Sequence, residues 1–466
     1  MALGRAGFTA VTAVRPTGTR LDRQQRLLAV GLVLGVMMVA FEITAVLTAL
    51  PTITDELHGD SLYGVTLACY TLANLVALVV TGELTDRYGP ARPYMASLLV
   101  FAGGLVVAAT ATNMALVVVG RTMQGSGTGG LAPIAYVLVK RAFPEDRQSG
   151  MYAFLSAGWV LPSLLAPAIA GTITDQIGWR WVFWFLLPLI PVVAFITIPP
   201  MRVYAASGTG VVRQSRIATA VLAAAGIGTL VTSLQFANPI AALGGAAIGL
   251  AMALPSLRRL LPAGLQHAAR GLPAAVLCRI LATAAFLGAD SFRPLAADRI
   301  HGASPTIQGF VIIGASLSWT GGQWFVAHRP DLDPSRTVQV GFAVLTLGLA
   351  ASIPVLVEGW PLWATFFCWS IGGFGMGLLF NPTTVAAMSY ADDGAEGLVS
   401  SQVNLADAIG FSTMGGIGGA MVAVSDRTNL TLPGALAINF TIAIGLGCCG
   451  VLCARRISAR AVSVSS

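Results

Sequence analysis

Long apolar stretches separated by short polar breaks are the dominant pattern of this sequence. A helix needs about 20 apolar residues to cross a bilayer. Stretches that reach or approach this length form groups of six, two and six. The pattern predicts an all-α, polytopic membrane protein with about fourteen transmembrane helices. The stretches cover residues 27–51, 62–81, 94–112, 114–138, 150–173, 181–200, 217–236, 238–256, 273–296, 305–327, 338–357, 361–388, 398–424 and 433–454.

The composition agrees with a bilayer rather than water as the solvent. Only 10% of the 466 residues are charged and 55% are hydrophobic, whereas a soluble chain carries roughly 25% charged residues. A disordered chain would need low hydrophobicity and high charge. The composition therefore argues against both a soluble enzyme and a disordered protein.

The distribution of basic residues predicts the orientation of the chain. The first apolar stretch is too long for a cleavable signal and lacks a small-residue cleavage site, so we expect it to remain as a helix. Basic residues concentrate on the cytoplasmic side of membranes, and alternating the stretches from a cytoplasmic N-terminus places 21 of the 27 Lys and Arg residues on that side. We therefore expect a multi-pass protein of the cytoplasmic (inner) membrane with both termini in the cytoplasm, and no nucleic-acid partner. The arginines that precede the first stretch are Arg5, Arg15, Arg20, Arg23 and Arg26.

The last six stretches resemble a diverged copy of the first six, at an offset of about 248 residues. The glycine pattern 125/127/129 recurs at 373/375/377, Ala170-Gly171 recurs at 418–419, and Glu42 corresponds to Asp290. Two halves related by a parallel repeat are typical of transporters with a substrate site between the halves. The predicted organisation is a basic N-terminus (1–26), a six-helix bundle (27–200), a linker with two inserted helices (201–272), a second six-helix bundle (273–455) and a tail (456–466).

The predicted loop after the second helix, 82–92, combines glycines with charges. Glycine permits close approach and positive φ, and Asp86 can pair with an arginine or with the start of a neighbouring helix. Such a contact would stabilise one state of a rocking bundle. An ordinary positive-inside loop would have the same composition, so the spacing alone leaves both interpretations open.

This loop resembles the G-x-L-x-D-R-x-G-R-R motif of the major facilitator superfamily. Gly82, Leu84, Asp86, Arg87 and Gly89 match, while Pro90-Ala91 replaces the basic pair and Arg92 is displaced. Residues 121–127, Arg-Thr-Met-Gln-Gly-Ser-Gly, are similar to the R-x-x-Q-G-x-G motif of the same family.

Two further segments resemble the fourteen-helix drug:proton antiporter branch of that family. Residues 42–51 are similar to its D-x-T-x-x-N-x-A-L-P signature, with Glu for Asp and Leu47 for Asn, and residues 179–183 are similar to its W-R-W-I-F segment. The fifth-helix antiporter motif G-x-x-x-G-P-x-x-G-G departs more, because only its proline and last glycine remain. The resemblance implies that Gly82, Asp86, Arg87, Gly89, Arg92, Pro167 and Gly171 take part in conformational gating.

Three acids and one arginine within the predicted helices are candidates for proton coupling: Glu42, Asp290, Asp407 and Arg121. A charge at mid-bilayer is costly and should face a cavity or a partner. At 1.5 Å per residue, Glu42 lies about 22 Å along its helix and Asp290 at a similar depth, so both could share a layer with Arg121. Burial raises the pKa of a carboxyl and a nearby arginine lowers it, which allows proton loading near neutrality.

The same residues also have more ordinary interpretations. Asp290 could be neutralised by Arg293 on the same helix face, Asp407 could be a structural hydrogen-bonding group, and Arg279 is predicted to snorkel to the cytoplasmic surface. For substrate binding we nominate Glu42, Gln124, Asn404 and Trp159. Tryptophans 159, 319 and 369 could stack on flat cations, although packing is their commoner role.

These features together predict a secondary transporter rather than an enzyme. The sequence has no G-x-x-x-x-G-K-[ST] loop, and Lys140 is the only lysine of the chain, so we expect no ATP-driven step and no cofactor or metal. The leading hypothesis is proton-coupled efflux of amphipathic, cationic or neutral drug-like compounds by alternating access, carried out by a monomer in the lipid bilayer. The alternatives are a lipid or dedicated metabolite exporter, or a non-transporting membrane sensor.

Overall fold

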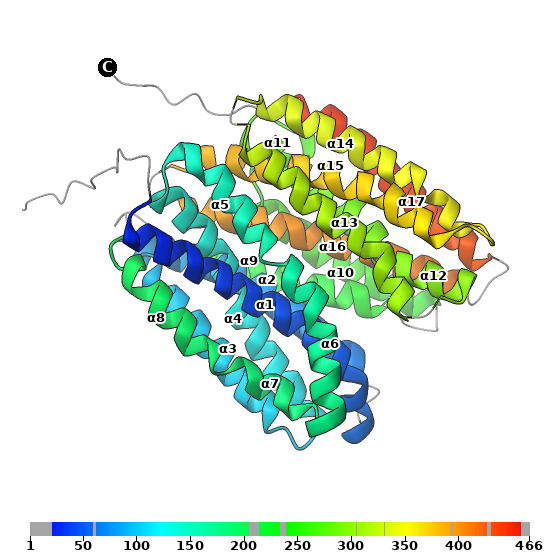
Figure 1. Ribbon diagram of the computed structural model, residues 1–466, viewed down its shortest axis with the longest axis horizontal. Coiled ribbons are helices and arrows are strands. Elements are labelled where there is room, and N and C mark those ends of the chain that lie inside the picture. The colour runs from blue at the N-terminus through cyan, green and yellow to red at the C-terminus, as the bar shows by residue number, and fades with distance from the viewer. Residues whose placement is uncertain are drawn as a thin grey trace, which may run out of the picture.

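The computed structural model describes residues 21–58, 62–204, 214–233, 239–303, 305–329, 331–392, 395–425 and 430–457. All regular secondary structure in these ranges is helical. The helices form two bundles that lie side by side (Figure 1). The first bundle contains α1 (Arg23–Glu56), α2 (Tyr63–Tyr88), α3 (Ala91–Ala109), α4 (Met114–Ala142), α5 (Glu145–Ala157), α6 (Val160–Ile177), α7 (Arg180–Leu186) and α8 (Leu189–Met201).

The second bundle and an intervening hairpin make up the rest of the described chain. Helices α9 and α10 pack against each other, and α9 also contacts α2 of the first bundle. The hairpin consists of α9 (Gln214–Ser233) and α10 (Pro239–Leu260), and the second bundle of α11 (Leu272–Asp290), α12 (Arg293–His301), α13 (Pro305–Ala327), α14 (Pro334–Ala351), α15 (Leu362–Ser389), α16 (Glu396–Ser425) and α17 (Leu432–Ala454).

Nine helical segments of the described residues are long and apolar enough to cross a membrane. Each of the fourteen predicted stretches overlaps at least one helix, but several of them do not meet that criterion. The all-helical, polytopic class is therefore confirmed, and the count of fourteen transmembrane helices stays a prediction.

Three of the predicted continuous helices are broken in the structure. The stretch 150–173 divides into α5 and α6 at Gly158, and the stretch 181–200 divides into α7 and α8 before Leu189. The stretch 273–296 ends as α11 at Asp290 and resumes as α12. Hydropathy alone did not reveal these breaks, because each interruption is itself apolar or only one or two residues long.

The repeated glycines allow the central helix of each bundle to pack closely against its neighbours. A Cβ atom on Gly125 of α4 would lie 2.1 Å from the carbonyl oxygen of Tyr70 on α2, and one on Gly373 of α15 would lie 2.1 Å from that of Ala315 on α13. Small residues permit such close backbone approach between membrane helices. The repeated glycines therefore perform the same packing role in both halves.

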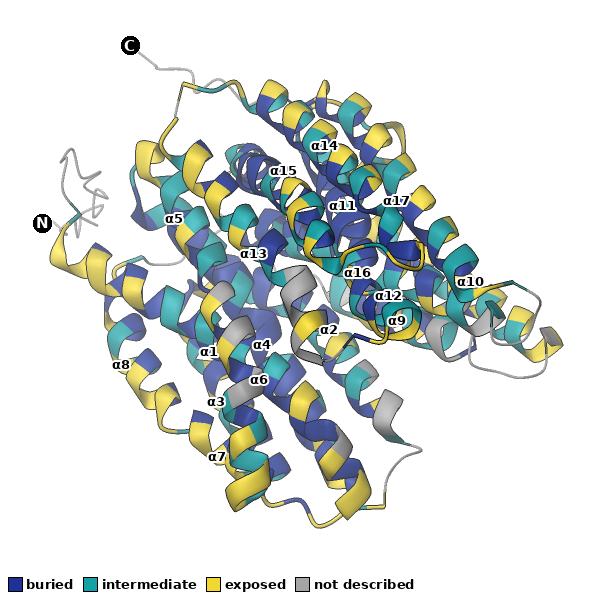
Figure 2. Ribbon diagram, turned by 45° about the vertical axis from the view of Figure 1, so that its right-hand side comes forward, coloured by how far each residue is buried: buried dark blue, intermediate teal, exposed yellow. Residues whose placement is uncertain are grey.

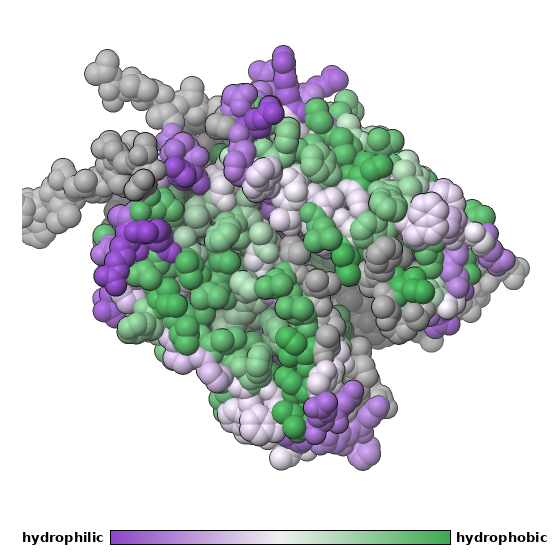
Figure 3. Space-filling view, viewed as in Figure 1, coloured by the Kyte–Doolittle hydropathy of each residue, from purple (hydrophilic) through white to green (hydrophobic). Residues whose placement is uncertain are grey.

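The outward faces of the helices are apolar. Phe195 of α8 is 83% exposed and Ile240 of α10 is 81% exposed, and Figure 2 shows exposed positions along the outward sides of both helices. In the view of Figure 1, Figure 3 shows hydrophobic residues over the middle of the visible surface and hydrophilic residues gathered towards its two ends. This distribution fits a protein surrounded by lipid.

Candidate functional site

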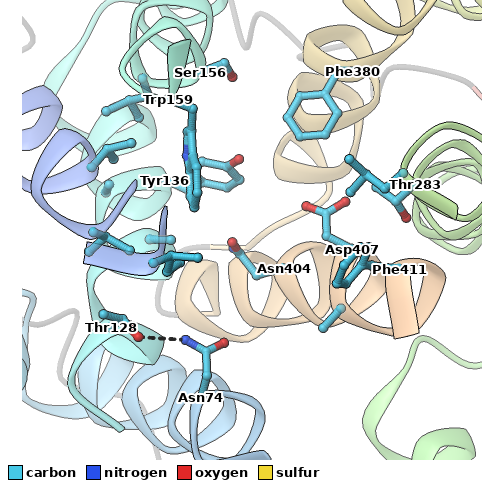
Figure 4. Close-up of a pocket in the computed structure, with 18 of the residues that line it drawn as sticks. Asn74, Thr128, Tyr136, Ser156, Trp159, Thr283, Phe380, Asn404, Asp407 and Phe411 are labelled. Carbon is cyan, nitrogen blue, oxygen red and sulfur yellow. Dashed lines mark hydrogen bonds between the residues drawn. The ribbon is translucent and has the colours of Figure 1, made fainter. Parts of the chain in front are cut away.

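A cavity of about 550 Å³ lies between the two bundles. The first bundle contributes residues of α1, α2, α4 and α5, as well as Trp159, and the second bundle contributes residues of α11, α13, α15 and α16. Figure 4 shows Tyr136 and Trp159 on one side of the space and Phe380, Asp407 and Phe411 on the other, with Asn404 between them. Aromatic and apolar walls with a few polar groups are typical of small-molecule sites.

Asp407 lines this cavity and forms an ion pair with Arg279. Nε of Arg279 lies 2.6 Å from Oδ1 of Asp407, and its second terminal nitrogen lies 2.8 Å from Oδ2. Arg279 also donates hydrogen bonds to the carbonyl oxygen of Phe380 and to the hydroxyl of Thr384. The two-point geometry orients the carboxylate and satisfies the guanidinium.

The prediction that Arg279 snorkels to the surface is wrong. Its side chain is 1% exposed, because the helix face that carries it is covered by α15 and α16 rather than by lipid. Depth along a helix predicts snorkelling only when the side chain has an open path to the interface.

Glu42 and Arg121 form a second ion pair, and it is completely closed off from solvent. Arg121 donates to Oε1 of Glu42 and, at 2.7 Å, to Oε1 of Gln124. Glu42 and Gln124 are both 0% exposed, and neither lines the cavity. The guanidinium carbon of Arg121 lies 4.2 Å from the centroid of the Tyr70 ring, and Tyr70 does line the cavity. The buried pair therefore touches the cavity wall without facing the cavity.

Asp290 and Arg293 are not in the ion pair that the sequence allowed. The helix break after Asp290 separates them, and both contact Trp369 instead: the indole N–H donates to Asp290 at 2.6 Å, and the guanidinium carbon of Arg293 lies 3.4 Å from the ring centroid. Arg293 also donates to Ser352 at 2.7 Å. The two opposite charges still interact electrostatically without a direct contact, so local neutralisation of Asp290 by Arg293 stays a prediction.

The internal repeat places corresponding residues at these two buried sites. Asp290 lies 248 positions after Glu42, and Trp369, which donates to Asp290, lies 248 positions after Arg121, which donates to Glu42. Each half thus pairs an acid of its first helix with a donor of its fourth predicted helix. In the second half a neutral indole has replaced the guanidinium.

At one end of the molecule the two bundles are joined by polar contacts around Asp86. Its carboxylate accepts hydrogen bonds from the backbone N–H groups of Gly397, at 2.7 Å, and Leu398, at 3.0 Å, in the first turn of α16. A Cβ atom on Gly82 would lie 2.6 Å from the carbonyl oxygen of Gly397. Asp86 thus has both partners that the sequence allows: the start of a helix, where a carboxylate is favourable, and an arginine, because a terminal nitrogen of Arg141 lies 3.9 Å from Oδ1 of Asp86.

Further contacts close the same end. Arg141 of α4 donates to Glu396 at 2.8 Å, and the hydroxyl of Ser400 donates to the carbonyl oxygen of Pro133 at 2.7 Å. Lys140 donates to the carbonyl oxygen of Ala391. These contacts join α4 of the first bundle to residues at the start of α16, or shortly before it, in the second bundle. Together with the contacts of Asp86 and the close approach of Gly82 to Gly397, which involve α2, we call them the interbundle gate.

The other residues predicted for conformational gating lie on or next to α2, α3 and α6. Gly89 ends α2 with a positive φ of 77°, which glycine adopts without strain. The guanidinium of Arg87 lies over the ring of Tyr88 at 5.1 Å, and Arg92 lies in the first turn of α3. Pro167 and Gly171 lie on α6, and an added Cβ on Gly171 would meet nothing within 4 Å.

At the opposite end, the W-R-W segment contacts the end of α1. Trp179 donates to Glu56 at 2.8 Å and Arg180 donates to it at 2.7 Å. The hydrogen bond from Arg180 is the main cause that lowers the pKa of Glu56 below its ordinary value, against burial, which raises it. Both residues that bond to Glu56 belong to the first bundle, so this contact does not join the two halves.

Among the predicted substrate-binding residues, the structure brings only Asn404 and Trp159 to the cavity. Sequence reasoning named Trp319 but missed several other lining residues, such as Asn74, Tyr136 and Gln323, which carry no charge and belong to no quoted motif. The signal that could have found one group is a stripe of polar and aromatic residues at helical spacing within the apolar stretch 305–327: Ser316, Trp319, Thr320 and Gln323.

A cavity between two apolar helix bundles, closed at one end by interbundle polar contacts, defines a membrane transporter. The sequence matches the family model of the Major Facilitator Superfamily over residues 32–415. The chain belongs to the Major Facilitator Superfamily.

Similar proteins are transporters by name. A probable multidrug-efflux transporter of Mycobacterium tuberculosis is 25% identical over 458 residues, which cover 92% of this chain and 95% of that protein. An uncharacterised MFS-type transporter of the same organism is 30% identical over 339 residues, which cover 69% of this chain. The match spans about half, 49%, of that relative's length.

Solved structures share the fold at low sequence identity. The human organic anion transporter MFSD10 (TETRAN) superposes with a TM-score of 0.69 at 16% identity, covering 93% of this chain and 100% of that chain. A bacterial homologue of the iron transporter ferroportin superposes with a TM-score of 0.64 at 9% identity, covering 93% and 99%. These similarities concern the fold alone.

Proposed function

We propose that this protein is a monomeric, proton-coupled antiporter that exports amphipathic, cationic or neutral drug-like compounds across the cytoplasmic membrane. The observation that carries the proposal is the buried Glu42–Arg121 pair, whose guanidinium contacts the ring of Tyr70, a residue of the cavity wall. Efflux is also the activity in the name of a relative that aligns along nearly the whole chain.

The buried pair supplies a site whose protonation depends on small movements. A buried carboxylate is tolerated while Arg121 stays in contact with it, because the guanidinium replaces the lost hydration. Movement of Arg121 away from Glu42 would leave an unpaired charge in an apolar layer, and the carboxyl would bind a proton instead. Since the guanidinium lies against Tyr70, a substrate that displaces this ring also displaces the arginine.

We propose that opening and closing of the interbundle gate provides the alternating access that transport requires. With the N-terminus in the cytoplasm, as the basic residues predict, the end that carries Asp86 faces the cytoplasm. That end is closed by the hydrogen bonds of Asp86 to α16 and by the Arg141–Glu396 pair. We infer that the cavity opens to the outer side in this state, and that opening of the gate would expose it to the cytoplasm.

Reconstitution under an imposed pH gradient tests the proposal. Purified protein in proteoliposomes is expected to concentrate ethidium, a cationic dye, or Nile red, a neutral one, only while a proton gradient runs in the opposite direction. Glu42→Gln is expected to abolish this uphill movement while substrate still equilibrates down its own gradient.

Glu56→Gln is the matched control, because Glu56 lies on the same helix but is half exposed at its end. It is expected to retain uphill transport. If Glu42→Gln still concentrates either dye against its gradient, Glu42 is not the coupling residue and the proposal fails.

A further inference from the structure

One side of α13 presents a row of polar and aromatic side chains to the cavity. Ser316, Trp319, Thr320 and Gln323 all line it, and their spacing of three and four residues places them on one helix face. We call these four residues the α13 stripe. The surrounding lining is mainly apolar, so the stripe is a concentrated source of hydrogen-bonding groups.

Two members of the stripe have hydrogen-bonding atoms without partners in the part of the chain that the structure describes. Gln323 is 1% exposed, yet neither its amide oxygen nor its amide nitrogen has a protein partner, and the same holds for the indole nitrogen of Trp319. Thr320 differs, because its hydroxyl donates to the carbonyl oxygen of Ser316 at 3.2 Å. Buried polar groups are normally satisfied, so a ligand or water must complete Gln323 and Trp319.

Trp319 is held in place by other aromatic rings. Its ring centroid lies 5.2 Å from that of Phe286 at an interplanar angle of 82°, and 5.0 Å from that of Phe380 at 67°. These edge-to-face contacts are favourable and fix the direction of the indole N–H. Trp319 and Gln323 are four residues apart, so the indole donor and the amide, which offers both a donor and an acceptor, lie on the same face of α13.

The charges around the cavity balance to zero. Asp407 is the only charged residue in the described lining, and Arg279 neutralises it through both carboxylate oxygens. Glu42 is 0% exposed and does not reach the cavity. A cationic substrate would find no unpaired carboxylate, and an anionic substrate would find no unpaired guanidinium.

We propose that the α13 stripe recognises uncharged, flat compounds that carry a cis amide, in which a carbonyl and an N–H lie side by side. The amide oxygen of Gln323 would accept from the ligand N–H, while Trp319 and the Gln323 amide nitrogen would donate to the ligand carbonyl. The aromatic walls would cover the two faces of the ring system. This inference rests on the proposed transport function and narrows its substrate class to neutral compounds.

Three tricyclic probes of nearly the same shape separate the contributions. Phenanthridinone carries the cis amide, N-methylphenanthridinone retains the carbonyl but lacks the N–H, and the N-methylphenanthridinium ion is a cation with neither group. Binding to the full-length protein in nanodiscs is measured by calorimetry. We expect phenanthridinone to bind about tenfold more tightly than its N-methyl derivative, and the cation to bind most weakly.

Variants of the stripe assign each hydrogen bond. Gln323→Leu is expected to remove the preference for phenanthridinone over its N-methyl derivative. Trp319→Phe, which keeps the aromatic packing, is expected to weaken both carbonyl probes equally. Gln339→Leu is the matched control, because this glutamine of α14 bonds to Ser335 within its own helix and does not line the cavity, and it is expected to leave the preference unchanged. The elution profile of each variant verifies folding.

Tighter binding of the cation to the wild-type protein, or no binding of phenanthridinone at all, overturns the proposal. So does a lactam preference that survives in Gln323→Leu. Transport under a pH gradient is scored separately: if binding shows the expected preference but no probe moves uphill, the proposed function fails and the assignment of the stripe stands. If uphill transport occurs without the lactam preference, the assignment of the stripe fails and the proposed transport function stands.

Discussion

Replacing Asp407 with asparagine tests whether the Asp407–Arg279 pair is a structural element of the cavity wall. The substitution keeps the shape of the side chain but leaves the charge of Arg279, which is 1% exposed, without its counter-ion. Removing one partner of a buried pair costs about 3–5 kcal/mol. The Asp407 side chain is 26% exposed towards the cavity, and the other acceptors of Arg279 remain, so we expect the lower part of that range, about 3–4 kcal/mol.

The free energy of unfolding, measured by titration of the detergent-solubilised protein with a denaturing detergent, is the assay. The double variant Arg279→Met/Asp407→Leu removes both charges and is expected to recover stability to within about 1 kcal/mol of wild type. Asn404→Ala, one turn away on α16, loses only a hydrogen bond within its own helix and is expected to cost less than about 1 kcal/mol. A double variant no more stable than Asp407→Asn would refute the reasoning.

Two further predictions concern the ends of the molecule. Asp86→Ala removes the carboxylate that accepts from Gly397 and Leu398, so hydrogen–deuterium exchange in the first turn of α16 is expected to accelerate; unchanged exchange would argue against a gate at this point. Glu56→Gln is expected to cost only a few tenths of a kcal/mol at pH 7, because both partners of the Glu56–Arg180 pair are exposed. Since the folded-state pKa of Glu56 is lowered, this stabilisation is present above the ordinary carboxyl pKa of about 4.3 and is lost as pH falls through the folded-state value. A difference in stability from wild type that grows in acid would contradict the assignment.

The fold class could be predicted from sequence because the solvent imposes it. Every backbone polar group within a bilayer must be satisfied inside its own segment, so apolar stretches of sufficient length can only be helices. The 248-residue repeat also predicted that Gly125 and Gly373 occupy equivalent places. A Cβ atom added to either glycine would lie 2.1 Å from a carbonyl oxygen of a neighbouring helix. The breaks after α5, α7 and α11 could not be predicted, because hydropathy averages over them.

The candidate site was predicted only in part, and the errors have one cause. Glu42 and Arg121 were identified because charges are rare in membrane helices, and Arg121 contacts Glu42 across two helices. Arg279 was misjudged and Gln323 was overlooked, since the direction of a side chain around its helix decides whether it meets lipid, a neighbouring helix or a cavity. One sequence does not fix that rotation.

The sequence by itself determined the solvent, the helical class, the repeat and the small set of charges that the membrane tolerates, because each follows from composition and spacing along the chain. The tertiary structure alone decided which charges neutralise each other. It placed Arg279 on Asp407 rather than at the surface, Trp369 rather than Arg293 on the carboxylate of Asp290, and Glu42 behind Tyr70 instead of in the cavity. Such pairings depend on the rotation and packing of helices distant in sequence, and these set the distances at which charges interact.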